Sequence, residues 1–297
     1  MPSTAETLRR SCAREMDSNP RGFAGADWLR DIFLAVPREH FVPDRVWWPA
    51  RDPHTGLYPL FDRTARPRQW LRAVYLPGAP LITQLDDGRT PPTAPASGVF
   101  TSSISSSGVV IELLRHLAPR PGDRVLEIGT GTGYTTALLA ARAGAGNTVS
   151  VEIDRHLADR ARHALATLRP GSPAPLVVTA DGEHGHAAGG PYDRIVATAS
   201  VRRIPGAWLE QLRPGGRLVA PLDTPFGHDL LIRLTGDGHG AGAGSCVARV
   251  EFMRVREQRA PRPYATLGWP EGLDPARWEH LSVEVGPAGQ RIRDTAG

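Results

Sequence analysis

Residues 125–134 read Val-Leu-Glu-Ile-Gly-Thr-Gly-Thr-Gly-Tyr, a short apolar run that leads into three alternating glycines. Val125, Leu126 and Ile128 form the kind of run that a parallel strand buried on both faces requires. The glycines allow a tight turn and let backbone N–H groups approach a ligand without Cβ atoms in the way. Strong helix formers follow over residues 137–141. The motif therefore predicts a buried strand, a ligand-binding turn and a helix, in that order.

The spacing of the glycines argues against a dinucleotide ligand. The dinucleotide fingerprint has glycines at its first, third and sixth positions, whereas the sixth position here is Tyr134. Glu127 on the preceding strand would repel a pyrophosphate and attract a ligand with positive charge. S-adenosylmethionine is such a ligand, because it carries a sulfonium and an ammonium group. The alternative is a glycine turn that only joins a strand to a helix. The candidate cofactor residues in this motif are Glu127, Gly129, Thr130, Gly131, Gly133 and Tyr134.

The composition is that of a globular chain. With 297 residues, 40% of them hydrophobic, the chain is long enough for one large domain or a medium one with appendages. It has neither an apolar run of about 18 residues nor the apolar segment of a secretory signal, so we expect a cytoplasmic protein with no membrane partner. Cys12 and Cys246 lie far apart in the sequence, which predicts reduced thiols and no metal site.

The positive charge of the chain does not by itself indicate nucleic-acid binding. The formal net charge is +4, and all 35 basic residues are arginines. These arginines are spread along the chain without a long basic run, which is typical of a solvated surface. We therefore expect no nucleic-acid partner. A mild preference for acidic peptides is the weaker alternative.

Residues 1–100 are predicted to form two helices followed by an irregular segment. Residues 6–16 and 28–36 carry helical periodicity, and two prolines disfavour helix in an extended crossing segment over residues 36–43. Residues 46–100 lack periodicity and are rich in proline, arginine and aromatic side chains. Because so long an irregular segment is usually functional, we expect it either to line a groove for a substrate peptide or to cap the core.

Six hydroxyl side chains crowd into positions 101–107, directly before a helix predicted over residues 109–117. One or two of them can cap that helix, because a hydroxyl oxygen accepts a backbone N–H at the first turn. The others are predicted to donate hydrogen bonds to an anionic group, which the helix N-terminus also favours. A flexible serine-rich linker is the alternative. The candidate substrate residues are Ser102, Ser103, Ser105 and Ser106.

Strands and helices then alternate at short spacing, which predicts a parallel α/β sheet. A strand over residues 148–152 ends in Glu152, about twenty residues beyond the glycines, where doubly wound folds place a ribose-binding carboxylate. The next strand ends in Asp181 and Gly182, and Asp181 suits an adenine amino group. Further elements are helices over residues 155–168 and 204–212, a turn over 214–216, strands over 194–198, 217–221 and 281–285, and a hairpin of 230–234 with 247–255.

The motifs at residues 36–43, 103–105, 125–134, 151–152, 180–182, 191–195 and 211–221 resemble, in this order, those of the protein-L-isoaspartate (D-aspartate) O-methyltransferase family. The resemblance implies a class I S-adenosylmethionine-dependent methyltransferase. That fold is Rossmann-like, with a seven-stranded, mostly parallel sheet whose last strand is antiparallel. We therefore expect a methyltransferase core over residues 101–256, an N-terminal segment over 1–100 on the substrate side, and a C-terminal extension over 257–297.

In that family the serine after the isoleucine, here Ser105, is associated with catalysis. The chain departs from the usual motif at Ser106 and at Ser107, where the family usually has a proline. An insertion over residues 46–75 and the C-terminal extension resemble bacterial relatives linked to lanthipeptide and graspetide biosynthesis. Those relatives methylate an aspartate of a modified peptide to give aspartimide and then isoaspartate. The implied substrate is a peptide or protein that carries aspartate or isoaspartate.

Three functions remain open at this point. We prefer a peptide-tailoring enzyme because of the inserted aromatic segment, ahead of an isoaspartyl repair enzyme and of a fold that binds a peptide without turnover. A carboxylate, with a reference pKa of about 4, is already ionised at pH 7, so methyl transfer to it needs no general base. The requirement is positioning of one oxygen in line with the sulfonium methyl. We predict that Ser105 donates a hydrogen bond to the other oxygen.

Overall fold

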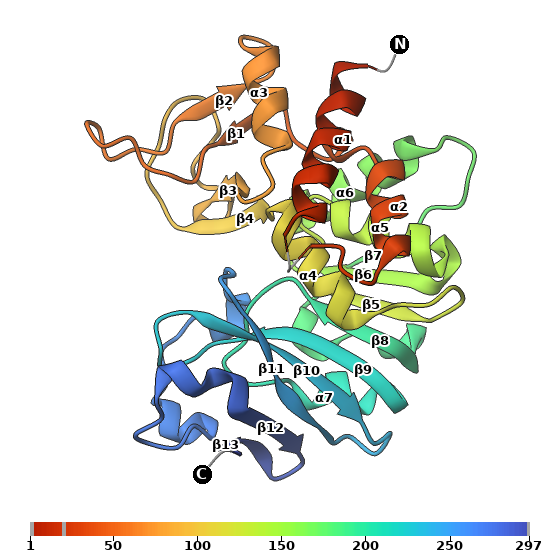
Figure 1. The fold of residues 1–297 in the computed structure, drawn as a ribbon, viewed down its shortest axis with the longest axis vertical. Coiled ribbons are helices and arrows are strands. Elements are labelled where there is room, and N and C mark those ends of the chain that lie inside the picture. The colour runs from red at the N-terminus through yellow and green to blue at the C-terminus, as the bar shows by residue number, and fades with distance from the viewer. Residues whose placement is uncertain (1–2, 20–21, 296–297) are drawn as a thin grey trace. The chain divides into compact units, whose positions relative to one another are not determined.

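The computed structural model of the chain describes residues 3–19 and 22–295. The chain forms two compact units (Figure 1). The first comprises Met1–Arg115, Thr130–Arg142 and Asp154–Ala174, and the second comprises His116–Gly129, Ala143–Ile153 and Pro175–Gly297. The glycine motif crosses the division, because Gly129 ends a segment of the second unit and Thr130 begins a segment of the first.

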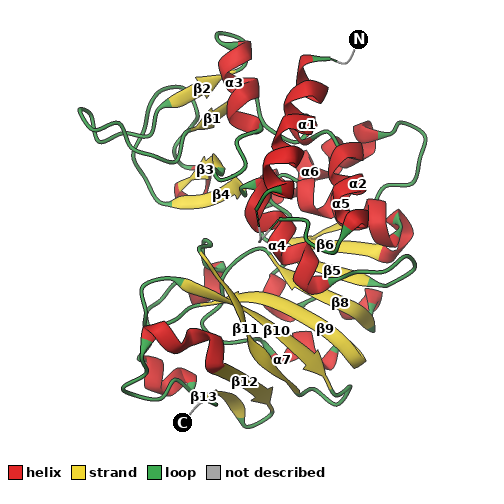
Figure 2. Ribbon diagram, viewed as in Figure 1, coloured by secondary structure: helices red, strands yellow, loops and turns green. Residues whose placement is uncertain are grey.

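The second unit is built on a mixed sheet, whose strands are yellow in Figure 2. Its described strands run in the order β13-β12-β11-β10-β9-β8-β5-β6-β7. The strands are β5 (Val125–Ile128), β6 (Thr148–Glu152), β7 (Leu176–Thr179), β8 (Tyr192–Ala197), β9 (Leu212–Leu222), β10 (Asp229–Gly236), β11 (Gly242–Val250), β12 (Leu281–Gly286) and β13 (Gly289–Asp294). The neighbouring strands in the part β9-β8-β5-β6-β7 pair in parallel. The neighbouring strands in the part β13-β12-β11-β10-β9 pair in antiparallel fashion. The predicted α/β class is confirmed.

The sheet differs from the predicted seven strands in width. The 9-stranded sheet contains the predicted hairpin, as β10 and β11, and then two more antiparallel strands from the C-terminal extension. The predicted turn over residues 214–216 is wrong, because β9 runs through it. Its register against β8 jumps from Tyr192↔Leu212 to Arg194↔Arg217. The Pro-Gly-Gly sequence is therefore accommodated as a bulge, where glycine is commonly found.

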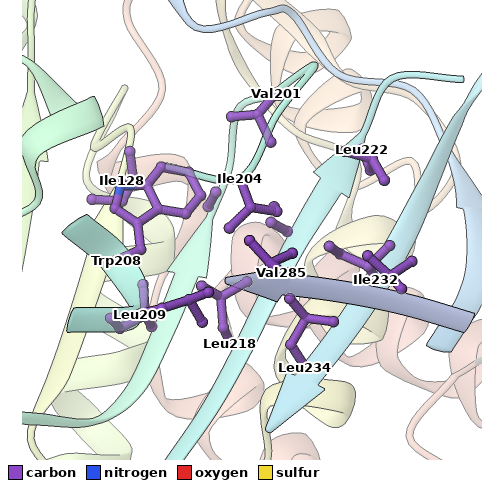
Figure 3. Close-up of a cluster of buried hydrophobic side chains, with 14 of the residues drawn as sticks. Ile128, Val201, Ile204, Trp208, Leu209, Leu218, Leu222, Ile232, Leu234 and Val285 are labelled. Carbon is purple, nitrogen blue, oxygen red and sulfur yellow. The ribbon is translucent and has the colours of Figure 1, made fainter. Parts of the chain in front are cut away.

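One buried core joins the parallel strands to the C-terminal extension (Figure 3). Its members come from elements that are distant in the sequence. Burial of each aliphatic member contributes about 1.5–3 kcal/mol to the free energy of unfolding, relative to the same side chain exposed to water. They include Ile128 of β5, Trp208 of α7 (Gly206–Glu210), Leu218 of β9, Ile232 of β10 and Val285 of β12. The extension is thus part of the same folded unit as the strands that carry the cofactor motif.

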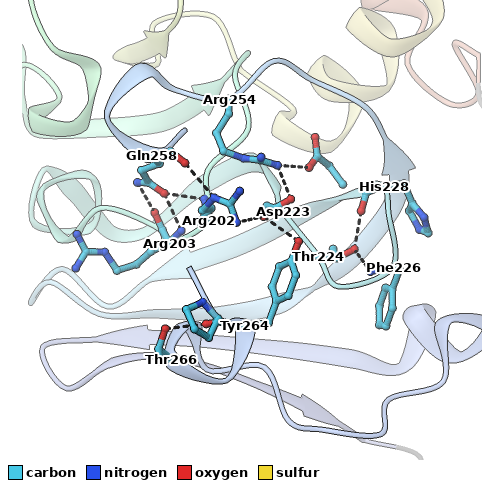
Figure 4. Close-up of polar contacts among 12 residues, drawn as sticks. Arg202, Arg203, Asp223, Thr224, Phe226, His228, Arg254, Gln258, Tyr264 and Thr266 are labelled. Atoms are coloured by element: carbon cyan, nitrogen blue, oxygen red, sulfur yellow. Dashed lines mark hydrogen bonds and ion pairs between the residues drawn. The ribbon is translucent and has the colours of Figure 1, made fainter. Parts of the chain in front are cut away.

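A polar cluster also ties the extension to the sheet (Figure 4). Asp223, just beyond β9, forms ion pairs with Arg202 at 3.0 Å and with Arg254. The Tyr264 hydroxyl donates to the same carboxylate at 3.2 Å. Asp223 is buried, and because its charge is paired the cluster avoids the cost of an isolated buried carboxylate.

The first unit contains helices and a small antiparallel sheet of order β2-β1-β3-β4. Its long helices are α1 (Thr4–Asp17), α2 (Asp27–Ala35), α3 (Pro67–Val74), α4 (Ser107–Leu117), α5 (Tyr134–Ala143) and α6 (Arg155–Leu168), and its strands are β1 (Arg45–Trp47), β2 (Leu60–Asp62), β3 (Leu81–Leu85) and β4 (Phe100–Ile104). Short 3-10 helices of the chain are η1 (Arg38–His40), η2 (Asp86–Gly88), η3 (Ala145–Asn147), η4 (Gly182–His184), η5 (Ala187–Gly189), η6 (Arg256–Gln258), η7 (Tyr264–Leu267) and η8 (Pro275–His280). The two predicted N-terminal helices are confirmed.

The prediction of an irregular segment over residues 46–100 is correct only in part, because the segment also contains short strands and α3. The segment contributes most of the four-stranded sheet, and Trp47, Tyr58, Ile82 and Leu85 form its buried core. Strands of three to five residues are too short to show an alternating pattern, which explains why the sequence did not reveal them. The extended crossing segment over residues 36–43 likewise contains one 3-10 turn, η1.

The linker alternative for the hydroxyl run is also wrong. Residues 100–104 form β4, which pairs with β3. Ser102 and Ile104 are buried, whereas Ser103 and Ser105 are partly exposed. This alternation is the side-chain period of a strand, so the run presents its hydroxyls on two opposite faces.

We expect Asp62, at the end of β2, to make the stability of the first unit acid-sensitive. Hydrogen bonds from the Thr64 hydroxyl (2.6 Å), from Arg45 Nε (2.8 Å) and from the Thr64 amide (2.8 Å) hold the pKa of Asp62 far below its usual range. The stabilisation is therefore present above the unfolded-state pKa of about 3.9 and is lost as the pH falls below it. Thermal melts of wild type and Asp62→Asn should differ most at pH 6, and the difference should shrink steadily as the pH falls below about 4. A difference that does not change with pH would contradict this.

Candidate functional site

The carboxyl ends of three neighbouring parallel strands bring together predicted cofactor residues in the second unit. Gly129 follows β5, Glu152 ends β6, and Asp181 follows β7 by two residues. The Gly129 amide donates to the Val151 carbonyl at 2.8 Å, and the Ala180 amide donates to the Glu152 carbonyl at 3.1 Å. The edge where open α/β sheets bind ligands therefore carries one glycine turn and two carboxylates.

Glu127 is a buried carboxylate on β5, two residues before Gly129. Its side chain is fully buried, and the Ser150 hydroxyl of β6 donates to Glu127 Oε2 at 2.7 Å. The carboxylate therefore cross-links β5 and β6 from within the sheet. Its negative charge would reach a cationic ligand through the protein, because a low-dielectric interior screens charge less than water does.

Gly182 is held against β5 and α7. Trp208 Nε1 donates to the Gly182 carbonyl at 2.8 Å, and a Cβ on Gly182 would lie 2.5 Å from Ile128 Cγ2. The adjoining Asp181 is the N-cap of η4, where its carboxylate accepts the Glu183 amide at 3.0 Å. Trp208 and Ile128 lie side by side in the core (Figure 3). Trp208 thus holds the residue that directly follows Asp181.

The glycines of the motif all adopt positive φ angles, +94° at Gly129, +54° at Gly131 and +86° at Gly133. A Cβ at Gly129 would lie 2.8 Å from Thr198 Oγ1, and one at Gly133 would lie 3.3 Å from Ala161 Cβ. The Gly133 amide donates to the Thr130 carbonyl at 2.9 Å, which closes the turn. The loop therefore needs glycine for its backbone conformation.

The side chain of Tyr134 packs inside the first unit. Its ring lies 5.1 Å from the Arg38 guanidinium carbon and 5.8 Å from the Phe41 ring centroid. Burial raises the pKa of the Tyr134 hydroxyl above its usual value. Only the backbone of Tyr134 is therefore placed to approach a ligand at the glycine turn.

Two of the candidate substrate serines meet the glycine turn. The Cβ position of Gly131 lies 3.6 Å from Ser102 Oγ and 3.7 Å from the Ser103 carbonyl oxygen. Ser102 is buried, and its hydroxyl accepts a hydrogen bond from Thr83 Oγ1 at 3.1 Å. The first unit thus brings β4, which carries the hydroxyl run and is called the hydroxyl strand below, against Gly131. This is the part of the motif that we expect to approach the cofactor.

Ser105 and Ser106 have different surroundings. The Ser106 hydroxyl accepts the Val109 amide at 3.4 Å, which makes it a cap of α4. Ser105 is partly exposed, and its carbonyl oxygen accepts Arg38 Nη2 at 2.7 Å. Among the described residues, the Ser105 hydroxyl has no hydrogen-bond partner. It is therefore available to donate to a bound group.

A cavity of 390 Å³ adjoins Gly131 within the first unit. Apolar groups of Phe41, Val42, Pro43 and Leu157 line part of it. Three residues of α6 that the sequence analysis did not single out, His156, Arg160 and His163, also line the cavity. Their spacing along α6 was the available signal, because residues four and three apart lie on one helix face. The cavity is large enough for a side chain of a bound peptide.

The described residues contain no group of three or more histidine, cysteine, aspartate or glutamate side chains that could hold a metal ion. None of their helices is long and apolar enough to cross a membrane. Cys12 and Cys246 are free and buried. Burial raises the pKa of the Cys12 thiol to about 11 and that of Cys246 to about 12.

Comparison with known proteins agrees with the geometry of the site. The family model described as protein-L-isoaspartate(D-aspartate) O-methyltransferase matches residues 92–260. Proteins named protein-L-isoaspartate O-methyltransferase are 46% identical over 129 residues in Methanoculleus marisnigri (43% of this chain, 57% of that protein) and 38% identical over 208 residues in Methylorubrum extorquens (69% and 86%). One in Methylibium petroleiphilum is 46% identical over 161 residues (52% and 58%). The chain thus matches somewhat more than half the length of several curated relatives.

Solved structures show the same fold. A protein-L-isoaspartate O-methyltransferase structure superposes with a TM-score of 0.67 at 20% identity, over 96% of this chain and 99% of that one. A putative protein-L-isoaspartate O-methyltransferase from Plasmodium falciparum, solved in complex with S-adenosyl-L-homocysteine, has a TM-score of 0.60 at 16% identity, over 86% of this chain and 100% of that one. The predicted class I methyltransferase fold is confirmed. The chain belongs to the protein-L-isoaspartate(D-aspartate) O-methyltransferase family.

Proposed function

We propose that the chain is an S-adenosylmethionine-dependent carboxyl O-methyltransferase that esterifies isoaspartyl residues of proteins or peptides. The observation that carries the proposal is the meeting of Gly131 with Ser102 and Ser103 in the first unit. It places a cofactor-type glycine turn against the strand whose next serine, Ser105, has an available hydroxyl. Membership of the family and the names of the relatives support the same activity.

The residues present fit S-adenosylmethionine. Left-handed glycines at positions 129, 131 and 133 leave the backbone of the turn open to a ligand. We assign the ribose hydroxyls to Glu152 and the adenine amino group to Asp181, as in doubly wound folds. Glu127 adds a buried negative charge suited to a cationic ligand. When bound, the cofactor supplies the methyl group.

The chain's own residues would act by positioning the acceptor. The isoaspartyl carboxylate is ionised at neutral pH, so no residue has to remove a proton. Ser105 donates a hydrogen bond to one carboxylate oxygen and leaves the other free to attack in line. The ester that forms loses methanol when the nitrogen of the following peptide bond attacks the ester carbonyl, which closes a succinimide. The cavity beside Gly131 would receive a flanking side chain of the peptide.

The proposal is tested with S-adenosylmethionine labelled in its methyl group. Two short peptides that differ only in an isoaspartyl or aspartyl linkage are compared, and the base-labile label that is released as methanol is counted. We expect turnover of the isoaspartyl peptide alone. No turnover of either peptide, with S-adenosylmethionine binding seen by calorimetry, would count against the proposal. No binding at all would favour the fold that binds a peptide without turnover.

The same assay addresses the peptide-tailoring hypothesis. That hypothesis rests on the inserted segment, which forms β1, β2 and α3. It expects activity on one constrained peptide with a normal aspartate and indifference to short isoaspartyl peptides. The names of the relatives fit the repair function better, so we place repair first.

Gly129→Ala is expected to weaken S-adenosylmethionine binding about tenfold. The new methyl group would lie 2.8 Å from Thr198 Oγ1, and the φ angle of +94° would be strained at a cost of about 1–3 kcal/mol. Gly215→Ala is the matched control, because its φ is +73° and no atom lies within 4 Å of its Cβ position. Calorimetric titration should show reduced affinity for the first variant alone. Equal affinities would contradict the assignment of this turn to the cofactor.

A further inference from the structure

Arg38 is a fully buried cation beside Ser105. Its Nε donates to the Val74 carbonyl at 2.9 Å and its Nη2 donates to the Ser105 carbonyl at 2.7 Å. Its guanidinium carbon lies 5.1 Å from the centre of the Tyr134 ring. The Arg38 side chain therefore connects three segments: the end of α3, the residue that follows the hydroxyl strand, and the first residue of α5.

Within the described part of the chain, no carboxylate forms an ion pair with Arg38. The adjacent Glu39 is already engaged, because it pairs with Arg9 at 3.1 Å and accepts the Tyr75 hydroxyl. Burial lowers the pKa of Arg38, and the neighbouring Tyr134, Cys12 and Tyr75 oppose that effect. A guanidinium nevertheless remains protonated in proteins. Among the described residues, a buried positive charge without a carboxylate partner thus persists next to Ser105.

Such an arrangement is costly unless something compensates the charge. Two backbone carbonyls and an aromatic face supply part of the compensation, and Nη1 is buried without a hydrogen-bond partner. The Ser105 carbonyl accepts a hydrogen bond from this guanidinium at 2.7 Å, so an anion held by the hydroxyl of the same residue would lie near the positive charge. At that range two opposite charges attract appreciably in a partly buried site.

We propose that Arg38 is a positioning residue that makes the acceptor site selective for an anionic carboxylate. It holds the Ser105 peptide group in place, and its charge favours the ionised isoaspartyl carboxylate over a neutral group of the same shape. The inference rests on the proposed function. Because the carboxylate loses its charge as it is methylated, the positive charge of Arg38 assists binding of the acceptor and does not assist the transfer step.

The test compares two ligands that differ only in charge. One is an isoaspartyl peptide, and the other has a carboxamide in place of its free isoaspartyl carboxyl group. Their dissociation constants are measured by calorimetry in the presence of S-adenosylhomocysteine, which prevents turnover. We expect wild type to prefer the acid, and we expect Arg38→Met to reduce that preference about tenfold or more. Arg38→Lys should retain the preference but lower kcat, because one ammonium cannot hold both carbonyls.

A second pair of variants tests the charge while leaving Arg38 in place. Cys12 is buried and lies within electrostatic range of Arg38. Cys12→Asp would give Arg38 an internal counter-ion and should reduce the preference for the acid. In Cys12→Asn the new side chain has nearly the same shape as aspartate but no charge, so the preference for the acid over the amide should be unchanged. This pair remains informative if Arg38→Met does not fold.

The outcomes separate cleanly. If Arg38→Met or Cys12→Asp retains the wild-type preference, the proposal is overturned. Weakening of acid and amide by the same factor would also overturn it, since that is the result expected of a purely structural arginine. Failure of wild type to bind S-adenosylmethionine or the isoaspartyl peptide would instead refute the proposed function.

Discussion

Ser105→Ala is expected to lower kcat for methyl transfer about 100-fold and to leave S-adenosylmethionine affinity unchanged. The hydroxyl is partly exposed and its carbonyl is fixed by Arg38, so the loss removes only the donor that orients the acceptor. A misplacement of about 1 Å in the reacting atoms can cost a factor of this size. The measurements are steady-state rates with labelled cofactor and calorimetric titration of the cofactor.

Thr101→Val on the same strand is the matched control. The Thr101 hydroxyl donates to Gln84 Oε1 at 2.9 Å and accepts the Asp87 amide at 3.0 Å, so it is already used within the protein. Its loss should cost about 1–3 kcal/mol of stability with kcat retained. Unchanged turnover of the Ser105 variant would remove Ser105 from the mechanism. Equal loss in both variants would indicate damage to the strand.

Among the variants proposed here, Trp208→Ala is expected to lower the free energy of unfolding most, by about 3–5 kcal/mol. The substitution removes a completely buried aromatic side chain. Trp208 also donates to the Gly182 carbonyl, and Gly182 follows the candidate adenine ligand Asp181. Its removal should therefore weaken S-adenosylmethionine binding as well. Urea denaturation and calorimetry measure the two effects.

Two further variants separate packing from the hydrogen bond. Trp208→Phe keeps most of the packing and loses the bond to Gly182, so we expect a smaller loss of stability with a clear loss of cofactor affinity. Trp48→Ala is the control for a less buried tryptophan, which stacks on Phe61 with ring centroids 5.6 Å apart. It should leave cofactor affinity unchanged. Full cofactor affinity in both Trp208 variants would show that Asp181 does not depend on this contact.

The candidate site was only partly predictable, for identifiable reasons. The sequence placed Glu152 and Asp181 at the ends of neighbouring strands, because carboxylates that follow parallel strands meet at one edge of a sheet. Tyr134 was included on the motif alone, and its side chain instead packs against Arg38 and Phe41. Arg38 was missed because nothing in residues 36–43 indicates that its side chain crosses to Ser105. That contact joins residues 67 positions apart in the sequence.

The fold, like the site, was predictable only in part. The order of strand, glycine turn and helix, the positions of the acids and the hairpin followed from the sequence by itself, because each depends on a local pattern of apolar residues and turn formers. Only the tertiary structure decided four other features. These are the four-stranded sheet, the bulge in β9, the cavity beside α6 and the burial of the Arg38 charge. Each of these depends on which distant segments pair or pack together, and a single sequence carries no local signal for that.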